Sequence, residues 1–214
     1  MYEAEKQEVL DTALCMRKYD LVALSGGNVT IRMPENHFLI TPSGMDYETM
    51  SPDDVLLIDA KGDVVEGHRR PSVDTSSILY IFEKMPWVNC VIHTHQPYAT
   101  AVGLVDDEFP ACLTTMLDAT RGPVKVAPYF PTADKDMGKL TVQYAGNSRA
   151  VILKHHGVMT FGKSLHEALM AAVYMEEAAK TYMAARVFGP LKSFSDEEIE
   201  HARYEADRYG QVNI

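Results

Sequence analysis

Two short apolar runs that carry histidines constrain the fold of this chain most. The first, Val91-Ile92-His93-Thr94-His95, has the composition of a strand, in which side chains two residues apart project from the same face. His93 and His95 therefore lie one pleat apart on one face. The second run, Ala150-Val151-Ile152-Leu153, is followed closely by His156. A fold in which the two runs meet would gather three imidazoles at one point.

These histidines, His93, His95 and His156, are candidate metal ligands. Three neutral imidazoles with an open fourth position are a common ligand set of catalytic Zn²⁺, so we predict a zinc enzyme. The alternative is structural, because a His-x-His pair in a strand is usually not a metal site and typical zinc spacings are more local than this one. The adjacent His155 is expected in the core or beside a ligand, because only one of two neighbouring histidines can readily face the ion.

Composition limits the class of protein. With 214 residues, 46% hydrophobic and 23% charged, the chain fits one soluble globular domain spanning residues 1–214. It has no apolar run of membrane-spanning length and no N-terminal signal pattern. Three scattered cysteines do not make a disulfide framework. We therefore expect a cytoplasmic protein.

The net charge of −10, with no cluster of lysines and arginines, bears on possible partners. A field of this sign repels nucleic acid and anionic membrane surfaces, so neither is expected as a partner. It also repels anionic metabolites. A phosphate group would therefore have to be bound locally, by backbone N–H groups, hydroxyls and the metal.

The hydrophobic periodicity predicts a mixture of helices and short strands. Helices are expected over residues 3–19, 76–85 and 98–104, and after the capping boxes that begin at Ser164 and Ser195; the first of these two should stop at Gly189-Pro190. Strands are expected over residues 28–32, 38–41, 55–59, 64–66, 89–93 and 124–127. The pattern lacks a regular βαβ alternation and a Gly-x-Gly-x-x-Gly turn. It therefore predicts an α/β layer fold with a largely antiparallel or mixed sheet and no dinucleotide site.

Three turn segments, residues 25–30, 41–44 and 71–74, offer groups that could bind an anion. They combine glycines, which let a backbone approach a ligand closely, with serine and threonine hydroxyls. Each segment alone is also ordinary turn chemistry. Asp74 has a second explanation as well, because it could simply cap the helix that follows it.

Six segments in order along the chain carry a family resemblance. With them, the whole chain resembles the class II sugar-phosphate aldolase and epimerase superfamily, and its fuculose-phosphate aldolases most. The segments are Gly26-Gly27-Asn28-Val29-Thr30, Thr41-Pro42-Ser43-Gly44, Pro71-Ser72-Val73-Asp74, His93-Thr94-His95, His155-His156-Gly157 and Tyr209-Gly210.

The resemblance implies a layered α/β/α fold around a mainly antiparallel sheet, and a homotetramer with its active sites at subunit interfaces. It assigns Zn²⁺ to His93, His95 and His156. It also implies that Tyr209 is an acid that reaches a neighbouring subunit's site, although a helix-end tyrosine could instead pack its ring on a partner. The substrate would be bound by Gly27, Asn28, Ser43, Gly44 and Ser72, the last four of which would hold its phosphate.

The details point to two reactions. Aldolases of this family carry Glu in place of Asp74 and Ser in place of Val73, whereas the epimerases carry Asp followed by Thr, as at Thr75, and a catalytic aspartate that falls on Asp118. The epimerases also have an extra segment between residues 128 and 150 that is missing here.

We expect a carbon–carbon lyase that splits a ketose 1-phosphate, such as L-fuculose 1-phosphate, into dihydroxyacetone phosphate and an aldehyde. The alternative is an L-ribulose-5-phosphate 4-epimerase. In either reaction Asp74 would serve as a fourth metal ligand or as the base, and in the epimerase Asp118 would supply the second proton. A third possibility, a non-catalytic scaffold module, would not need the three histidines.

Overall fold

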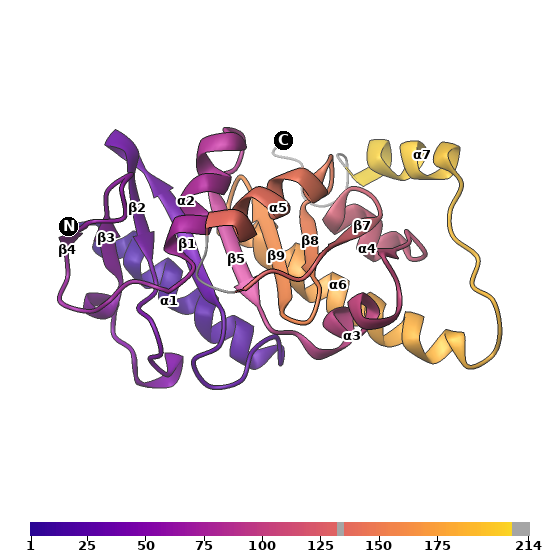
Figure 1. The fold of residues 1–214 in the computed structure, drawn as a ribbon, viewed down its shortest axis with the longest axis horizontal. Helices are drawn as coiled ribbons and strands as arrows, with labels where there is room; N and C mark the ends of the chain where they lie inside the picture. The colour runs from indigo at the N-terminus through magenta and orange to yellow at the C-terminus, as the bar shows by residue number, and fades with distance from the viewer. Residues whose placement is uncertain (132–134, 207–214) are drawn as a thin grey trace, which may run out of the picture.

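The computed structural model describes residues 1–131 and 135–206. Within them, nine strands form one sheet in the order β4-β3-β2-β1-β5-β9-β8-β7-β6 (Figure 1). Neighbouring strands are antiparallel, except for the parallel pair β7 and β8. The strands are β1 (Asn28–Met33), β2 (His37–Ile40), β3 (Leu56–Ile58), β4 (Val64–Glu66), β5 (Cys90–Thr94), β6 (Glu108–Phe109), β7 (Val124–Ala127), β8 (Ala150–Leu153) and β9 (Gly157–Gly162).

Helices cover both faces of this sheet. Figure 1 shows α2 and α5 in front of the sheet, and α1 and α6 behind it. The helices are α1 (Glu3–Lys18), α2 (Thr75–Lys84), α3 (Pro97–Val105), α4 (Thr114–Thr120), α5 (Lys135–Ala145), α6 (Leu165–Arg186) and α7 (Asp196–Ala206), and the short 3₁₀ turns are η1 (Pro34–Asn36), η2 (Tyr47–Thr49) and η3 (Pro52–Asp54). None of the helices in the described ranges is long and apolar enough to span a membrane.

The two faces are built by the alternation of side chains along buried strands. In β5, Val91 belongs to the core beneath α2 and α5, whereas the next residue, Ile92, belongs to the core shared with α1 and α6. All five residues of β5 are buried, as expected for a strand covered on both sides. This α/β/α layering and the mostly antiparallel sheet confirm the fold class expected from the sequence.

Some expectations about local structure were wrong or incomplete. α6 ends at Arg186, a little before the expected stop at Gly189-Pro190, and α4, α5, β6 and β9 were not anticipated. His155 is exposed rather than buried, because it occupies the tight turn between β8 and β9 with a φ of 60°. The capping box at Ser195 is present, with Ser195 and Glu198 exchanging hydrogen bonds.

The order of the central strands brings the functional segments together. β5 lies between β1 and β9, and both pairings are antiparallel. Asn28, at the start of β1, is opposite His93, and Thr94, at the end of β5, is opposite Val158, near the start of β9. His95 follows the last residue of β5 and His156 precedes the first residue of β9. Both therefore lie just beyond the same ends of the central strands, next to the first residue of β1.

Candidate metal centre and active site

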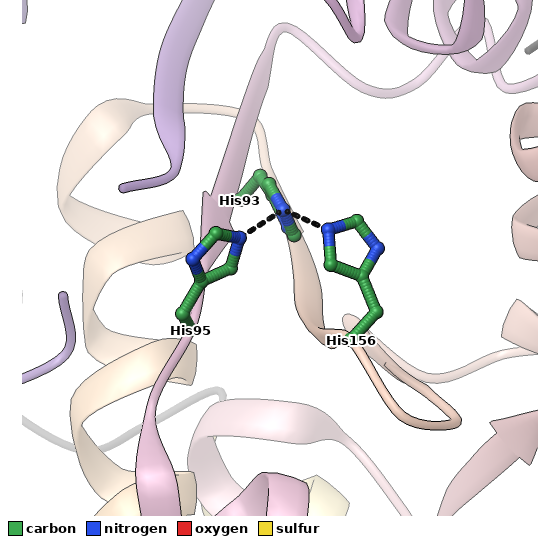
Figure 2. Close-up of side chains that lie close together, drawn as sticks. All are labelled: His93, His95 and His156. Carbon is green, nitrogen blue, oxygen red and sulfur yellow. Dashed lines mark hydrogen bonds between the residues drawn. The ribbon is translucent and has the colours of Figure 1, made fainter. Parts of the chain in front are cut away.

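The structure gathers His93, His95 and His156 around one point. The Nε2 atom of His93 lies 3.0 Å from Nε2 of His95 and 3.2 Å from Nε2 of His156. Figure 2 shows the three rings pointing toward one another, with His93 between the other two. Within the described residues, these three side chains form a group whose candidate ligand atoms all lie within 4.8 Å of one another. The two histidine-bearing runs thus meet, as a metal site shared by the three histidines requires.

Glycine makes this convergence possible at Gly157, the first residue of β9. A Cβ atom there would lie 2.1 Å from the carbonyl oxygen of Thr94, so only a residue without a side chain allows β5 and β9 to approach this closely. The approach places His156, the preceding residue, against His93 and His95. A glycine after the third histidine is therefore a geometric requirement of the cluster.

The protonation state of the cluster suits a metal. His93 is 1% exposed, and its Nδ1–H donates to the carbonyl oxygen of Val158 at 2.9 Å. Burial, together with the two neighbouring imidazoles, holds the pKa of His93 well below its ordinary value. Burial also lowers the pKa of His95 and His156. All three rings are therefore neutral near pH 7, which is the form that binds metal.

The arrangement of nitrogens provides a test of whether a metal fits. With its proton on Nδ1, His93 presents one lone pair at Nε2, yet two imidazole nitrogens lie within hydrogen-bonding distance of that atom. One lone pair cannot accept two well-directed hydrogen bonds. Zinc–imidazole bonds of about 2.0–2.1 Å in tetrahedral geometry would place the nitrogens about 3.3–3.4 Å apart. The two spacings from His93, 3.0 and 3.2 Å, are close to that, and all three candidate ligand atoms lie within 4.8 Å of one another, so the residues present fit a metal ion.

A carboxylate lies beside the cluster. Asp74 Oδ2 is 4.0 Å from His93 Nε2 and accepts a hydrogen bond from Asn28 Nδ2 at 2.9 Å. Asp74 occupies the N-cap position of α2, but its side chain makes no capping hydrogen bond. The capping explanation of this residue is therefore wrong, and its carboxylate faces the histidines instead. Asp74 lies outside the three-histidine group, so its role as a fourth ligand stays a proposal.

Asn28 links this carboxylate to a serine. Its Nδ2 also donates to Ser72 Oγ at 3.0 Å, and the side chain is almost fully buried. Its Oδ1 atom is buried and has no hydrogen-bond partner among the described residues. A buried amide oxygen of this kind is costly to leave unsatisfied. It is therefore available to a donor on a bound ligand, such as a substrate hydroxyl.

These side chains open into a cavity of about 250 Å³. The cavity contains four of the five residues expected to bind the substrate, and the fifth, Asn28, is hydrogen-bonded to two residues of its wall. Val73, which is 59% exposed, contributes an apolar patch to it. The lining residues are Ser25, Gly26, Gly27, Pro42, Ser43, Gly44, Ser72, Val73, Asp74, His95 and His156.

Tyr47 supports this cavity and was missed from the sequence. Its hydroxyl donates to the carbonyl oxygens of Gly27 at 2.8 Å and Gly26 at 3.2 Å, and it is nearly fully buried in η2. Burial raises the pKa of the Tyr47 phenol, which keeps the group protonated as a donor. No local signal links a tyrosine to a glycine turn 20 residues earlier. Only the folded chain shows this contact.

One candidate residue of the described part of the chain, Asp118, is not brought to the cavity. Asp118 lies on α4, which packs against α6 and α7, and it does not line the cavity. Burial raises the pKa of its carboxyl group, with Arg121 acting in the opposite direction. Tyr209 lies outside the described residues. The roles of both stay proposals.

Comparison with known proteins agrees with the geometry. Residues 7–183 match the class II aldolase and adducin N-terminal domain. The chain is 30% identical over 213 residues to the 5-deoxy-D-ribulose 1-phosphate aldolase of Bacillus thuringiensis serovar kurstaki, covering 99% of both chains. It is 32% identical over 211 residues to L-ribulose-5-phosphate 4-epimerase UlaF of Salmonella paratyphi C, covering 93% of this chain and 92% of that protein.

The fold has a similar relative among solved structures. An L-fuculose 1-phosphate aldolase superposes with a TM-score of 0.89 at 28% identity, covering 94% of this chain and 95% of that one. Sequence and fold are thus similar to enzymes of sugar-phosphate chemistry over almost their whole length. The chain therefore belongs to the class II aldolase and adducin N-terminal domain family, as an enzyme of its class II aldolase type.

Proposed function

We propose that this enzyme is a zinc-dependent aldolase that cleaves a ketose 1-phosphate, L-fuculose 1-phosphate or a similar sugar, into dihydroxyacetone phosphate and an aldehyde. The observation that carries the proposal is the convergence of three neutral imidazoles beside a carboxylate, in a cavity with glycine and serine turns. The similarity to two ketose 1-phosphate aldolases supports the substrate class. We further propose that the enzyme acts in the cytoplasm.

The metal would be held by His93, His95 and His156. When bound, Zn²⁺ supplies Lewis-acid polarisation of the substrate carbonyl. We propose zinc because three neutral imidazoles with room for a further ligand are typical of its catalytic sites. The three rings also leave the Asp74 side of the cluster open for substrate oxygens.

The phosphate would be bound at the glycine and serine turns. Ser43 and Ser72 offer hydroxyls, and Gly27 and Gly44 offer backbone N–H groups at the cavity wall. Such local donors suit a protein whose net charge of −10 would otherwise repel the substrate. Val73 adds no hydroxyl to this set, so Ser43 and Ser72 supply the hydroxyl contacts.

The proton transfers are proposed for Asp74 and Tyr209. In the cleavage direction the C4 hydroxyl loses its proton and the C3–C4 bond breaks, which yields the aldehyde. C3 keeps the bonding electron pair and gains a proton, which yields dihydroxyacetone phosphate. Asp74, hydrogen-bonded to Asn28 and 4.0 Å from His93, would move the proton at C3. Tyr209 would accept the proton that the C4 hydroxyl loses in cleavage and return it in the reverse reaction.

A second candidate function is an L-ribulose-5-phosphate 4-epimerase. Asp74, Thr75 and Asp118 match the epimerase pattern, and a relative of similar identity is named as such an enzyme. The same cleavage would occur, but the aldehyde would rotate and recombine before leaving. Asp118 would then supply the second proton, from a neighbouring subunit, because it does not line the cavity of its own subunit.

A substrate assay separates the two. Zinc-loaded enzyme is incubated with L-fuculose 1-phosphate, 5-deoxy-D-ribulose 1-phosphate or L-ribulose 5-phosphate, and a coupled dehydrogenase detects free dihydroxyacetone phosphate. We expect release from a ketose 1-phosphate, and none with the His95→Ala variant as the matched control. A changed sugar with no fragment released would overturn the aldolase proposal in favour of the epimerase.

We also propose a homotetramer in which Tyr209 completes the site of a neighbouring subunit. Two inactive variants, His95→Ala and Tyr209→Phe, can be co-expressed with different affinity tags and purified as mixed oligomers. A site formed between them can combine intact histidines from one chain with an intact tyrosine from the other. Partial recovery of activity is expected, and activity no higher than that of either variant alone would contradict a shared site.

A further inference from the structure

A buried carboxylate lies beneath the segment that carries His95. Glu176, on α6, is only 2% exposed. Its Oε1 accepts the backbone N–H of Tyr98 and its Oε2 accepts that of Ala99, each at 2.9 Å. Both N–H groups belong to the first turn of α3, which begins at Pro97. A side chain from one helix thus binds the N-terminus of another.

The contact replaces the usual local cap. The first N–H groups of a helix have no partner within the helix and are normally satisfied by the N-cap side chain. In α3 the N-cap residue is Gln96, whose side chain makes no capping bond. Its Oε1 accepts from Thr94 Oγ1 at 2.6 Å, and its Nε2 donates to the carbonyl oxygen of Ala172 on α6 at 3.2 Å. Glu176 therefore satisfies donors that Gln96 cannot.

These bonds place the backbone on both sides of His95. Thr94 before it and Gln96 after it are fully buried, and Gln96 is tied to α6. The N–H of His95 itself donates to the carbonyl oxygen of Leu21 at 3.1 Å. One turn further along α6, Glu176 fixes the start of α3. The position of His95 is thus set from α6 through its two neighbours in the chain, which are buried and hydrogen-bonded to each other and to α6.

The charge on Glu176 is opposed by burial and favoured by its partners. Burial raises the pKa of the Glu176 carboxyl, and the N–H groups of Tyr98 and Ala99 and the charge on Lys180 act in the opposite direction. The N-terminus of a helix carries a partial positive charge, which favours an anion there. The carboxylate is neither in the cavity nor among the cluster of possible metal ligands. It can therefore act on the site only through the segment it holds.

We propose that Glu176 is a positioning residue for the metal ligand His95: by holding the N-terminus of α3 on α6, it keeps the His95 imidazole directed at His93 and His156. The inference rests on the proposed metal site. Removing the carboxylate should loosen His95 and weaken metal binding. His156, which arrives from the β8–β9 turn, should be unaffected.

The test compares Glu176→Gln with Glu177→Gln. The first change is nearly isosteric but places an amide N–H where a backbone donor needs an acceptor. The second removes an exposed carboxylate from the same helix, where it pairs with Lys180. Zinc affinity is measured by competition with a chelator, and the unfolding midpoint of the metal-free protein is measured in parallel. NMR of the metal-free protein follows the ring resonances of His95 and His156.

We expect Glu176→Gln to weaken zinc binding about 10–100-fold, the range typical of residues that hold a metal ligand in place. The His95 resonances should move while those of His156 stay, and Glu177→Gln should match the wild type in all three measurements. A purely structural role would lower the unfolding midpoint without changing zinc affinity, and that result would overturn the inference.

Two further outcomes are distinguishable. If the wild type binds no zinc, both the metal site and this inference fail, whereas equal affinity of wild type and Glu176→Gln overturns the inference alone. If Glu176→Gln does not fold, Glu176→Asp replaces it, because it keeps the charge but shortens the reach by one methylene. We expect its zinc affinity to fall measurably below that of the wild type, and an unchanged affinity would count against the proposal.

Discussion

Two cavities of this protein differ in what their polar groups still lack. The first, which we call the histidine cavity, has about 250 Å³ and is lined by His95, His156 and Asp74, among others. The second, the Arg32 cavity, has about 510 Å³ and is lined by Arg32, Lys61 and eight further residues between the β3–β4 hairpin and α2. The larger cavity offers more room, whereas the smaller one lies beside side chains whose hydrogen bonding is incomplete.

The arginine of the Arg32 cavity is already engaged by its own surroundings. Arg32 donates to the carbonyl oxygens of Phe82 and Val88, and its guanidinium lies over the rings of Phe38 and Phe82. Beside the histidine cavity, by contrast, one lone pair of His93 faces two imidazole nitrogens, and the Oδ1 of Asn28 is buried without a hydrogen-bond partner among the described residues. The candidate active site is therefore identified by polar groups that need a ligand to complete their bonding, and not by the volume of its cavity.

The largest effect is expected from removing a ligand. His95→Ala should abolish zinc binding and reduce activity to background while the fold stays intact, because a catalytic metal in a surface cavity is seldom the main source of stability. Metal analysis, activity and circular dichroism check this. His155→Ala is the matched control, since that neighbour is exposed in the β8–β9 turn and should behave like the wild type. Collapse of the fold in His95→Ala would show a structural metal instead.

The next effect concerns the carboxylate. Asp74→Asn keeps the shape and the neighbourhood of Asn28 but cannot accept a proton, so we expect turnover to fall about 10²–10⁴-fold with zinc largely retained. Steady-state kinetics and metal analysis on one preparation provide the measurement. Unchanged turnover would remove Asp74 from the proton transfer, and loss of zinc would instead support its role as a ligand.

The histidine cluster should also make the metal-free protein sensitive to acid. Burial lowers the pKa of His93, His95 and His156 below the ordinary value near 6.5, so the unfolded chain takes up protons first as pH falls. The three histidines therefore leave the free energy of unfolding unchanged above about pH 6.5. Below that value they lower it progressively as the pH falls. Urea unfolding of chelator-treated protein between about pH 7.5 and 5.5 should show the decline.

Two variants sharpen this comparison. His156→Gln should lessen the acid-induced loss of stability, whereas His166→Gln, at an exposed position on α6, should leave it unchanged. The same decline in both variants would place its origin outside the cluster.

A smaller effect is expected at Tyr47. Tyr47→Phe removes the hydroxyl that donates to the carbonyl oxygens of Gly26 and Gly27, at a cost of about 1 kcal/mol in the free energy of unfolding. Because these glycines line the cavity at the turn proposed to bind the phosphate, KM for the sugar phosphate should rise while kcat changes little. A fall in kcat with an unchanged KM would contradict this role.

The smallest effect is expected in the Arg32 cavity. Lys61→Ala removes an exposed side chain from its rim and should change the free energy of unfolding by less than about 0.5 kcal/mol, with kcat and KM unaltered. Chemical denaturation and steady-state kinetics test this. A clear loss of activity would mean that the larger cavity takes part in function and would break the comparison.

The sequence predicted the parts of the fold and site that local pattern encodes. Alternation in the run that ends at His95 predicted one face for His93 and His95, and the cluster has that arrangement. Sequence pattern and family resemblance together predicted the layered fold and the meeting of the two histidine-bearing runs. Contacts set by distant parts of the chain could not be read in this way.

Asp74 and Glu176 illustrate that limit. From the sequence, Asp74 served equally well as a helix cap or a site carboxylate, and only the contact with Asn28, 46 residues away, separates the two. Glu176 resembled any acid on an amphipathic helix, and its partners at Tyr98 and Ala99 are almost 80 residues away. The short elements α4 and β6 lacked a periodic signal for a similar reason, because their burial depends on neighbours from elsewhere in the chain.

The central claim is that one divalent cation is shared by three imidazoles. Anomalous X-ray diffraction at the zinc edge from crystals of the zinc-loaded protein tests it most directly. We predict one strong peak within about 2.0–2.1 Å of the Nε2 atoms of His93, His95 and His156. A peak elsewhere, or three rings joined only by hydrogen bonds in a crystal grown with excess zinc, would contradict the account.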